Sequence, residues 1–112
     1  MQTIDFSDFL KVDIRCAEIL SAEPLEGARK PAYRLELDCG PELGIKQSSA
    51  QVTDLYRPEG LKGKRVLCVV NFPPKRIAGF KSEVLVLGLD STDGGVSLIG
   101  ADHHVKPGSR LY

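Results

Sequence analysis

The sequence contains no long apolar run. None of its apolar stretches approaches the roughly 20 consecutive residues that a membrane-spanning helix requires. The first residues, MQTIDFSDFLK, also lack the basic segment and the long apolar segment that together define a secretory signal peptide. We therefore expect no membrane insertion, and we expect a cytoplasmic location.

Cysteine is scarce. The three cysteines, Cys16, Cys39 and Cys68, are odd in number and widely spaced, and no Cys-x-x-Cys pair is present. Each stands among apolar residues of an expected strand. This pattern indicates buried, reduced thiols that pack as small hydrophobic side chains, rather than metal ligands or a nucleophile.

The signatures of catalysis are also missing. The sequence has no GxSxG elbow, HExxH helix, P-loop or dinucleotide-binding glycine pattern. The only two histidines, His103 and His104, are adjacent, so their side chains diverge, and a solvated loop explains them best. Glu36 and Asp38 are placed on the solvent face of a strand. We predict no enzymatic activity, no cofactor and no metal ion.

Net charge is absent as well, with 15 basic and 15 acidic residues, but the charges are segregated along the chain. Residues 60–82 carry six basic side chains and no acidic one, whereas residues 83–102 carry four acidic and no basic side chains. A neutral total therefore hides a basic middle segment, which favours a polyanionic partner, although such charge runs are usually solvated faces.

What the sequence does contain is a series of short strands. The clearest covers residues 33–39 (YRLELDC), where apolar and polar side chains alternate. Other strands are expected at 14–20, 44–49, 65–71, 83–89, 96–99 and 109–112, with a helical turn at 53–56 and an amphipathic turn or helix at 5–11. A small barrel fits this order better than a sandwich of two sheets. We predict one all-β domain over residues 1–112, an OB-fold five-stranded barrel with a short helix after the third strand and small N- and C-terminal extensions.

The stretch NFPPKRIAGFKSEVLVLG at residues 71–88 combines two chemistries. Its prolines stiffen the exit from a buried strand, and its cations suit phosphates, while Phe80 offers an apolar face. These residue types are typical of an edge that reads RNA. A polar hairpin loop with Phe80 packed into the mouth of the barrel is an equally good interpretation of the spacing alone.

Three segments resemble the tRNA-binding domain family, which includes C-terminal domains of bacterial methionyl-tRNA synthetases. They are Asp13-Ile14-Arg15, residues 33–40 and the Asn71-x-x-Pro-Lys-Arg-Ile-x-Gly-x-x-Ser82 segment. Longer blocks at 44–51, 56–61 and 70–87 resemble stand-alone members that are described as chaperones related to protein export. The resemblance covers about residues 9–112. It implies an OB-fold, a homodimer and a tRNA-binding surface on the barrel.

The resemblance also implies a set of contact residues. The expected tRNA-binding side chains are Asn71, Lys75, Arg76, Lys81, Ser82, Lys46, Ser48 and Ser49. This sequence departs from the family pattern at Pro73, where many members carry lysine, and at Glu83-Val84, which adds an anion beside the expected RNA surface. We therefore expect weaker tRNA affinity than in the domains that are appended to synthetases.

Two functions compete for the same segment. The cations favour tRNA binding, whereas Phe72, Pro73, Ile77 and Phe80 favour an apolar groove that holds unfolded or export-bound polypeptides. A protein that does both is compatible with the sequence, and so is a purely peptide-binding export chaperone in which tRNA binding is vestigial. Apolar side chains before the barrel and in the C-terminal segment 105–112 further predict a two-fold symmetric homodimer.

Overall fold

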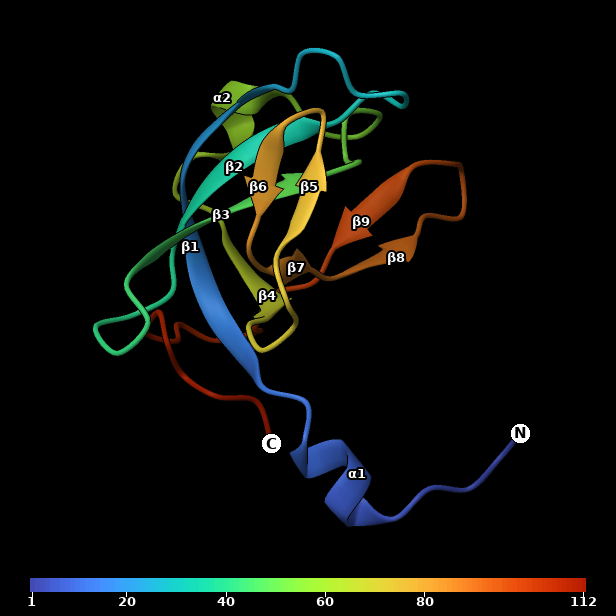
Figure 1. Ribbon diagram of the computed structural model, residues 1–112, viewed down its shortest axis with the longest axis vertical. Helices are drawn as coiled ribbons and strands as arrows, with labels where there is room; N and C mark the ends of the chain where they lie inside the picture. Colours follow the sequence, from blue (N-terminus) through green and yellow to red (C-terminus); the bar gives the residue numbers. More distant parts are fainter.

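A computed structural model describes all residues, 1–112, and shows a mostly β protein (Figure 1). The helices are α1 (Phe6–Leu10) and α2 (Pro58–Leu61). The strands are β1 (Ile14–Pro24), β2 (Tyr33–Asp38), β3 (Ile45–Ala50), β4 (Arg65–Val69), β5 (Lys75–Ile77), β6 (Phe80–Ser82), β7 (Leu85–Val86), β8 (Gly88–Asp90) and β9 (Val96–Leu98).

A five-stranded antiparallel sheet in the order β3-β2-β1-β4-β7 curls into a nearly closed barrel. β1 is its central strand and pairs with β4 through its first half and with β2 through its second half. The register between β1 and β2 shifts between Ile19 and Ser21, so Leu20 is an extra residue that bends the strand. This bend lets one long strand serve both sides of the barrel, which confirms the predicted barrel architecture.

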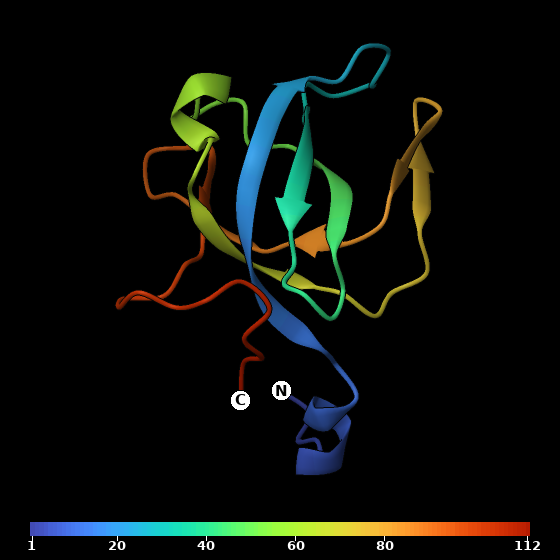
Figure 2. The same ribbon diagram turned by 90° about the vertical axis from the view of Figure 1, so that its left-hand side faces the viewer.

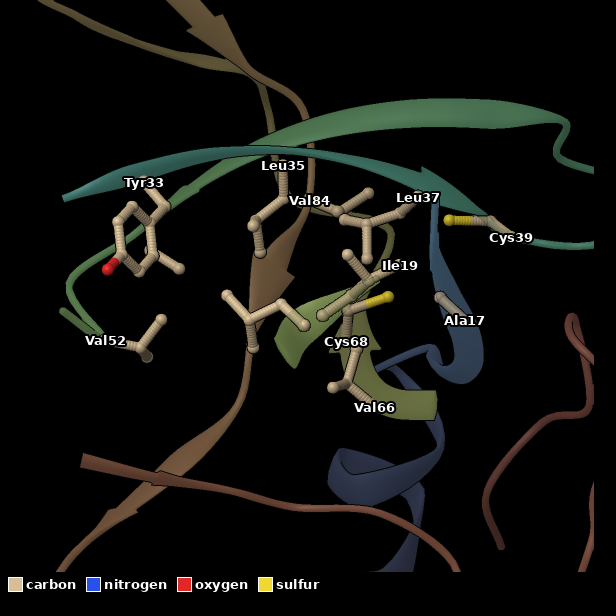
Figure 3. Close-up of a cluster of buried hydrophobic side chains, with 12 residues drawn as sticks. Ala17, Ile19, Tyr33, Leu35, Leu37, Cys39, Val52, Val66, Cys68 and Val84 are labelled. Atoms are coloured by element: carbon tan, nitrogen blue, oxygen red, sulfur yellow. The ribbon is translucent and has the colours of Figure 1, made fainter. Parts of the chain in front are cut away.

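The alternating pattern of β2 is confirmed. Tyr33, Leu35 and Leu37 are buried, whereas Arg34 and Glu36 are exposed. The buried side chains meet those of β1, β4 and the segment before β7 in one core (Figure 3), whose members are Ala17, Ile19, Tyr33, Leu35, Leu37, Cys39, Ala50, Val52, Leu61, Val66, Cys68 and Val84. One apolar cluster therefore fills the barrel.

Cys39 and Cys68 belong to this core, and Cys16 is buried outside it. All three are free and at most 2% exposed, in agreement with the prediction that they act as hydrophobic side chains. A hydrogen bond with the Cys39 thiol, together with burial, raises the pKa of Cys68. Burial raises the pKa of Cys16. Both effects keep these thiols neutral and unreactive at physiological pH.

Several predicted elements are wrong in position. Residues 53–55 form a turn rather than a helix, and the helix before β4 starts instead at Pro58, which suits a first helical position because proline lacks an N–H group. The predicted strand 83–89 is divided between β7, which pairs with β4, and β8, which pairs with β9. The predicted terminal strand is reduced to one bridge between Arg15 and Arg110.

α1 projects from one end of the barrel, near the C terminus (Figure 1). None of its residues is buried, and Phe6 is 72% exposed. The helix is joined to the barrel by the side chain of Asn71, which accepts a hydrogen bond from the Asp13 N–H (3.0 Å) and donates one to the Lys11 carbonyl (2.7 Å). Neither helix has the length and apolar character that a membrane crossing requires.

Candidate nucleic-acid and polypeptide interface

The cationic part of the 71–88 stretch is a β-hairpin rather than an irregular loop. β5 and β6 pair antiparallel, with Lys75 opposite Ser82 and Ile77 opposite Phe80. The two turn residues, Ala78 and Gly79, have φ angles of 52° and 77°. Positive φ at both central positions is the pattern of a type I′ turn, which matches the right-handed twist of the strands that it joins.

The hairpin presents three free cations. Lys75, Arg76 and Lys81 are all exposed, and none of them lies within ion-pair distance of a carboxylate. The only hydrogen bond that these three side chains make is a long one of 3.4 Å from Arg76 to the Gly79 carbonyl. Paired residues of a hairpin share a face, so Arg76 and Lys81 lie together on the face opposite Lys75.

The predicted serines lie where β3 meets the segment between β6 and β7. Ser82 Oγ accepts a hydrogen bond from the Ser49 N–H (3.1 Å), and Ser48 Oγ donates one to the Val84 carbonyl (2.7 Å). Ser48 is fully buried. The hydroxyl of Ser48 therefore closes the barrel and does not face solvent.

Lys46 and Glu83 lie at the same seam. Glu83 accepts a hydrogen bond from the Gln47 N–H at 3.2 Å, and its own N–H donates to the Gln47 carbonyl at 2.8 Å. The Lys46 ammonium lies 4.0 Å from the Glu83 carboxylate. Glu83, the anion that distinguishes this sequence from the family pattern, therefore joins β3 to the segment between β6 and β7. It also offsets the charge of Lys46.

Three of the four predicted polypeptide-binding residues line one apolar groove of about 600 Å³: Phe72, Pro73 and Ile77. Its lining residues come from the end of β3, from β7 and from both strands of the β5–β6 and β8–β9 hairpins. Figure 1 shows β7 between these two hairpins. Lys75, Ser49 and Ser82 line the groove as well. Sequence reasoning missed the remaining apolar lining residues, which include Val84, Val86, Val96 and Leu98, because the strands that carry them meet the β5–β6 hairpin only in the tertiary fold.

Phe80 lies outside this groove. It lines a smaller recess against polar side chains of β1, β2 and β3, among them Glu23, Arg34 and Gln47. Phe80 is paired with Ile77 in the hairpin, but it lines this recess and not the groove that Phe72, Pro73 and Ile77 line. Phe80 is also not among the partly buried apolar side chains that pack against the core of the barrel.

Comparison with known proteins identifies the relatives of this chain. The family described as "Putative tRNA binding domain" matches residues 14–110. The CsaA chaperone of Bacillus anthracis is 50% identical, with a TM-score of 0.91, over 99% of this chain and 100% of the other. The CsaA chaperone of Picrophilus torridus is 44% identical, with a TM-score of 0.92, over 98% of this chain and 100% of the other.

Longer proteins match as well. Methionine–tRNA ligase 1 of Bacillus anthracis is 36% identical over 98% of this chain, but this chain spans only 16% of the length of the ligase. The barrel, the cationic hairpin beside β3 and the family match over nearly the whole sequence agree with one another. On this evidence, the chain belongs to the tRNA-binding domain family.

Proposed function

We propose that this protein binds tRNA through its β5–β6 hairpin. The observation that carries the proposal is the group of exposed cations without carboxylate partners on this hairpin, in a chain of the tRNA-binding domain family. Cations that neutralise RNA phosphates release condensed counterions, and this release drives binding. The type I′ turn holds the cations at fixed spacing, so less conformational entropy is lost when RNA binds.

The proposed tRNA contacts differ in expected strength. Lys75, Arg76 and Lys81 are the primary phosphate contacts, and Lys46 is weaker because Glu83 offsets its charge. Ser49 and Ser82 lie at the rim of the groove beside them. We leave Ser48 out of the contact surface because it is buried. Asn71 is exposed and already bonds to Lys11 and Asp13, which leaves its second N–H and a second oxygen lone pair for RNA.

The test is a tRNA titration over a range of salt concentrations. The log–log plot of affinity against salt is linear, with a slope of about −0.7 to −0.9 per phosphate neutralised. Lys75→Ala combined with Arg76→Ala should reduce the magnitude of this slope by about two units without lowering the melting temperature, because exposed cations stabilise the fold little. Lys11→Ala combined with Lys106→Ala removes the same charge elsewhere and should leave the slope nearly unchanged.

Two outcomes would contradict the proposal. Wild-type protein that retains no tRNA at low salt would exclude tRNA binding as its function. An unaltered slope in the hairpin double variant would move the RNA surface away from β5 and β6.

A second candidate function is the holding of unfolded or export-bound polypeptides. The observation that favours it is the groove of about 600 Å³, whose lining is mainly apolar, in a chain similar over its full length to two CsaA chaperones. Burial of apolar side chains of a client in this groove would be driven by the hydrophobic effect. If aggregation of a client is suppressed while tRNA is not bound at low salt, the protein is a polypeptide-binding chaperone in which tRNA binding is vestigial.

We further propose that the chain acts as a single, non-catalytic domain in the cytoplasm. The family match supports a binding role, and the match to methionine–tRNA ligase covers only 16% of that enzyme. The two CsaA chaperones are matched over their whole length, which supports one domain. Absence of methionylation activity in the purified protein, and recovery of the protein with the cytosolic fraction, are the corresponding measurements.

A homodimer completes the proposal. Phe6 and Leu10 of α1 are 72% and 52% exposed, and the ring centroids of Phe6 and Phe9 lie 5.9 Å apart. The C-terminal Tyr112 is also fully exposed. Such apolar surface is typical of a two-fold interface.

Light scattering should give a molecular mass of twice 12.2 kDa. Phe6→Ser combined with Leu10→Ser should give a monomer, whereas Leu89→Ser, at another exposed position, should not.

A further inference from the structure

A second cationic pocket lies on the other side of the barrel from the hairpin. Its volume is about 420 Å³, and it lies between the start of β4 and the loop after β9. Figure 2 shows the β5–β6 hairpin on one side of the molecule, and α2, the start of β4 and the C-terminal loop on the opposite side. The fold therefore divides the basic segment 60–82, placing Lys64 and Arg65 here and Lys75, Arg76 and Lys81 at the hairpin.

The guanidinium of Arg65 is held in place at this pocket. It bonds to Glu18 on β1 at 3.3 Å and donates to the Val105 carbonyl. The same Nη1 atom that bonds to Val105 lies 3.2 Å from Nε2 of His104. No partner is bonded to the Nε–H of Arg65, so this donor remains available. A fixed, always charged guanidinium with a free donor is the preferred protein group for a phosphate.

Two further donors line the same pocket. Lys64 has no carboxylate partner and lies 5.8 Å from the centroid of the Tyr56 ring. His104 is exposed, and its ring nitrogens contact only Arg65. The pocket is lined also by His103, whose partner Asp102 has a fully exposed side chain. No carboxylate lines the pocket. Glu18 bonds to Arg65 but is not one of the lining residues.

The backbone fixes this arrangement. A Cβ on Gly100 would lie 2.9 Å from the Arg65 carbonyl oxygen, so only glycine allows the loop to approach β4 this closely. The Leu67 N–H donates to the Ile99 carbonyl at 3.0 Å and anchors the same loop. The loop that carries His104 is therefore positioned against Arg65 before any ligand arrives.

We propose that this pocket binds a phosphate group. Arg65, Lys64 and His104 line one space from two chain segments, and no carboxylate lines it with them. The phosphate would accept hydrogen bonds from Arg65 and Lys64 and from a ring N–H of His104. It comes either from a free phosphate compound or from the backbone of RNA. The inference is independent of tRNA binding at the hairpin, because it rests on different residues.

The first arm of the test uses inorganic phosphate. Because the protein has only two histidines, their ring protons are readily resolved by NMR. The His103→Asn variant retains only the His104 resonances and so assigns the two sets. Titration with phosphate, against chloride at equal ionic strength, should shift the His104 resonances. Lys64→Ala should weaken the apparent affinity by about threefold to tenfold. Lys75→Ala, which removes the same charge at the hairpin, should leave it unchanged. Lys64 and His104 are exposed, so their variants retain the fold.

The second arm identifies the source of the phosphate. Lys64→Ala combined with His104→Asn should lower the magnitude of the tRNA salt slope by about one unit if RNA supplies the phosphate. An unchanged slope, together with phosphate-induced shifts of His104, assigns the pocket to a free phosphate compound. The inference is overturned if phosphate does not move the His104 resonances and the tRNA slope is unaffected by the double variant.

Discussion

Gly40 and Gly108 face each other where the C-terminal segment crosses the turn after β2. A Cβ on Gly40 would lie 2.6 Å from the Gly108 Cα atom, and both residues have a φ angle of 92°. At this crossing the Gly108 N–H donates to the Cys16 carbonyl at 2.7 Å, and the Gly108 carbonyl accepts from Arg15 at 3.2 Å. Two glycines thus allow the segment that closes the end of the barrel to lie directly on the backbone of another turn.

Substitution of Gly40 should therefore be strongly destabilising. Gly40→Ala introduces both positive-φ strain and a backbone clash, and we expect a loss of about 3 kcal/mol or more in the free energy of unfolding. Gly63→Ala is a matched control, because Gly63 has a φ angle of 87° but nothing within 4 Å of its Cβ position. It should lose only about 1 kcal/mol. Urea unfolding measures both, and equal losses would show that close approach of the two turns contributes nothing.

Asp13 should make stability depend on acid. Its carboxylate binds Arg15 through two hydrogen bonds, of 2.6 and 3.1 Å, and lies 3.5 Å from Arg110. The hydrogen bonds from Arg15 lower the pKa of Asp13 below its ordinary value of 3.8, although burial opposes the shift. A lowered folded-state pKa stabilises the protein above the unfolded-state pKa, and this contribution is lost as the pH falls through the folded-state value.

Asp13→Asn removes this contribution. At neutral pH we expect a loss of about 2 kcal/mol, which should shrink toward zero as the pH falls below about 4. Glu42→Gln is the control, because Glu42 binds the same Arg15 at 3.1 Å but its side chain is 75% exposed. Its effect should stay within about 0.5 kcal/mol. A loss for Asp13→Asn that does not change with pH would show that the carboxylate charge is not the stabilising element.

Ala78 should limit the order of the hairpin. It is the only residue other than glycine with a positive φ angle, and alanine lacks the preference of asparagine for this conformation. Ala78→Asn should slow hydrogen exchange of the β5 and β6 amides by about threefold, whereas Ala78→Val should accelerate it. Because neither variant changes the charge, tRNA affinity should follow the same order with an unchanged salt slope. If tRNA affinity does not change with the order of the hairpin, the spacing of the cations is unimportant for tRNA binding.

The groove residues should be separable from Phe80 in a chaperone assay. Phe72 is 52% exposed and lines the groove, so Phe72→Ser should reduce the suppression of client aggregation severalfold while retaining the fold. Phe80→Ser changes the same side chain outside the groove and should leave most of the activity. The reverse result would place polypeptide binding at the recess beside β2 rather than above β7.

Elements with a local signal could be predicted from the amino-acid pattern alone. Alternation along Tyr33–Asp38 defined the buried face of β2, the apolar setting of Cys39 and Cys68 marked them as core residues, and the cations of the 71–88 stretch were correctly expected on the surface. Period-two patterns and side-chain polarity report burial directly, because each residue carries that information in its own chemistry.

The polar groups that bond within the fold could not be identified before the strands were placed in space. Ser48 bonds to Val84, Asn71 bonds to Lys11 and Asp13, and Glu83 bonds to Gln47, across 36, 60, 58 and 36 positions of the chain. The partner of a hydroxyl, amide or carboxylate is chosen by the pairing of distant strands, and no local pattern encodes it. The same long-range pairing forms the groove and leaves Phe80 in a separate recess. It also places the two halves of the basic segment on opposite sides of the barrel.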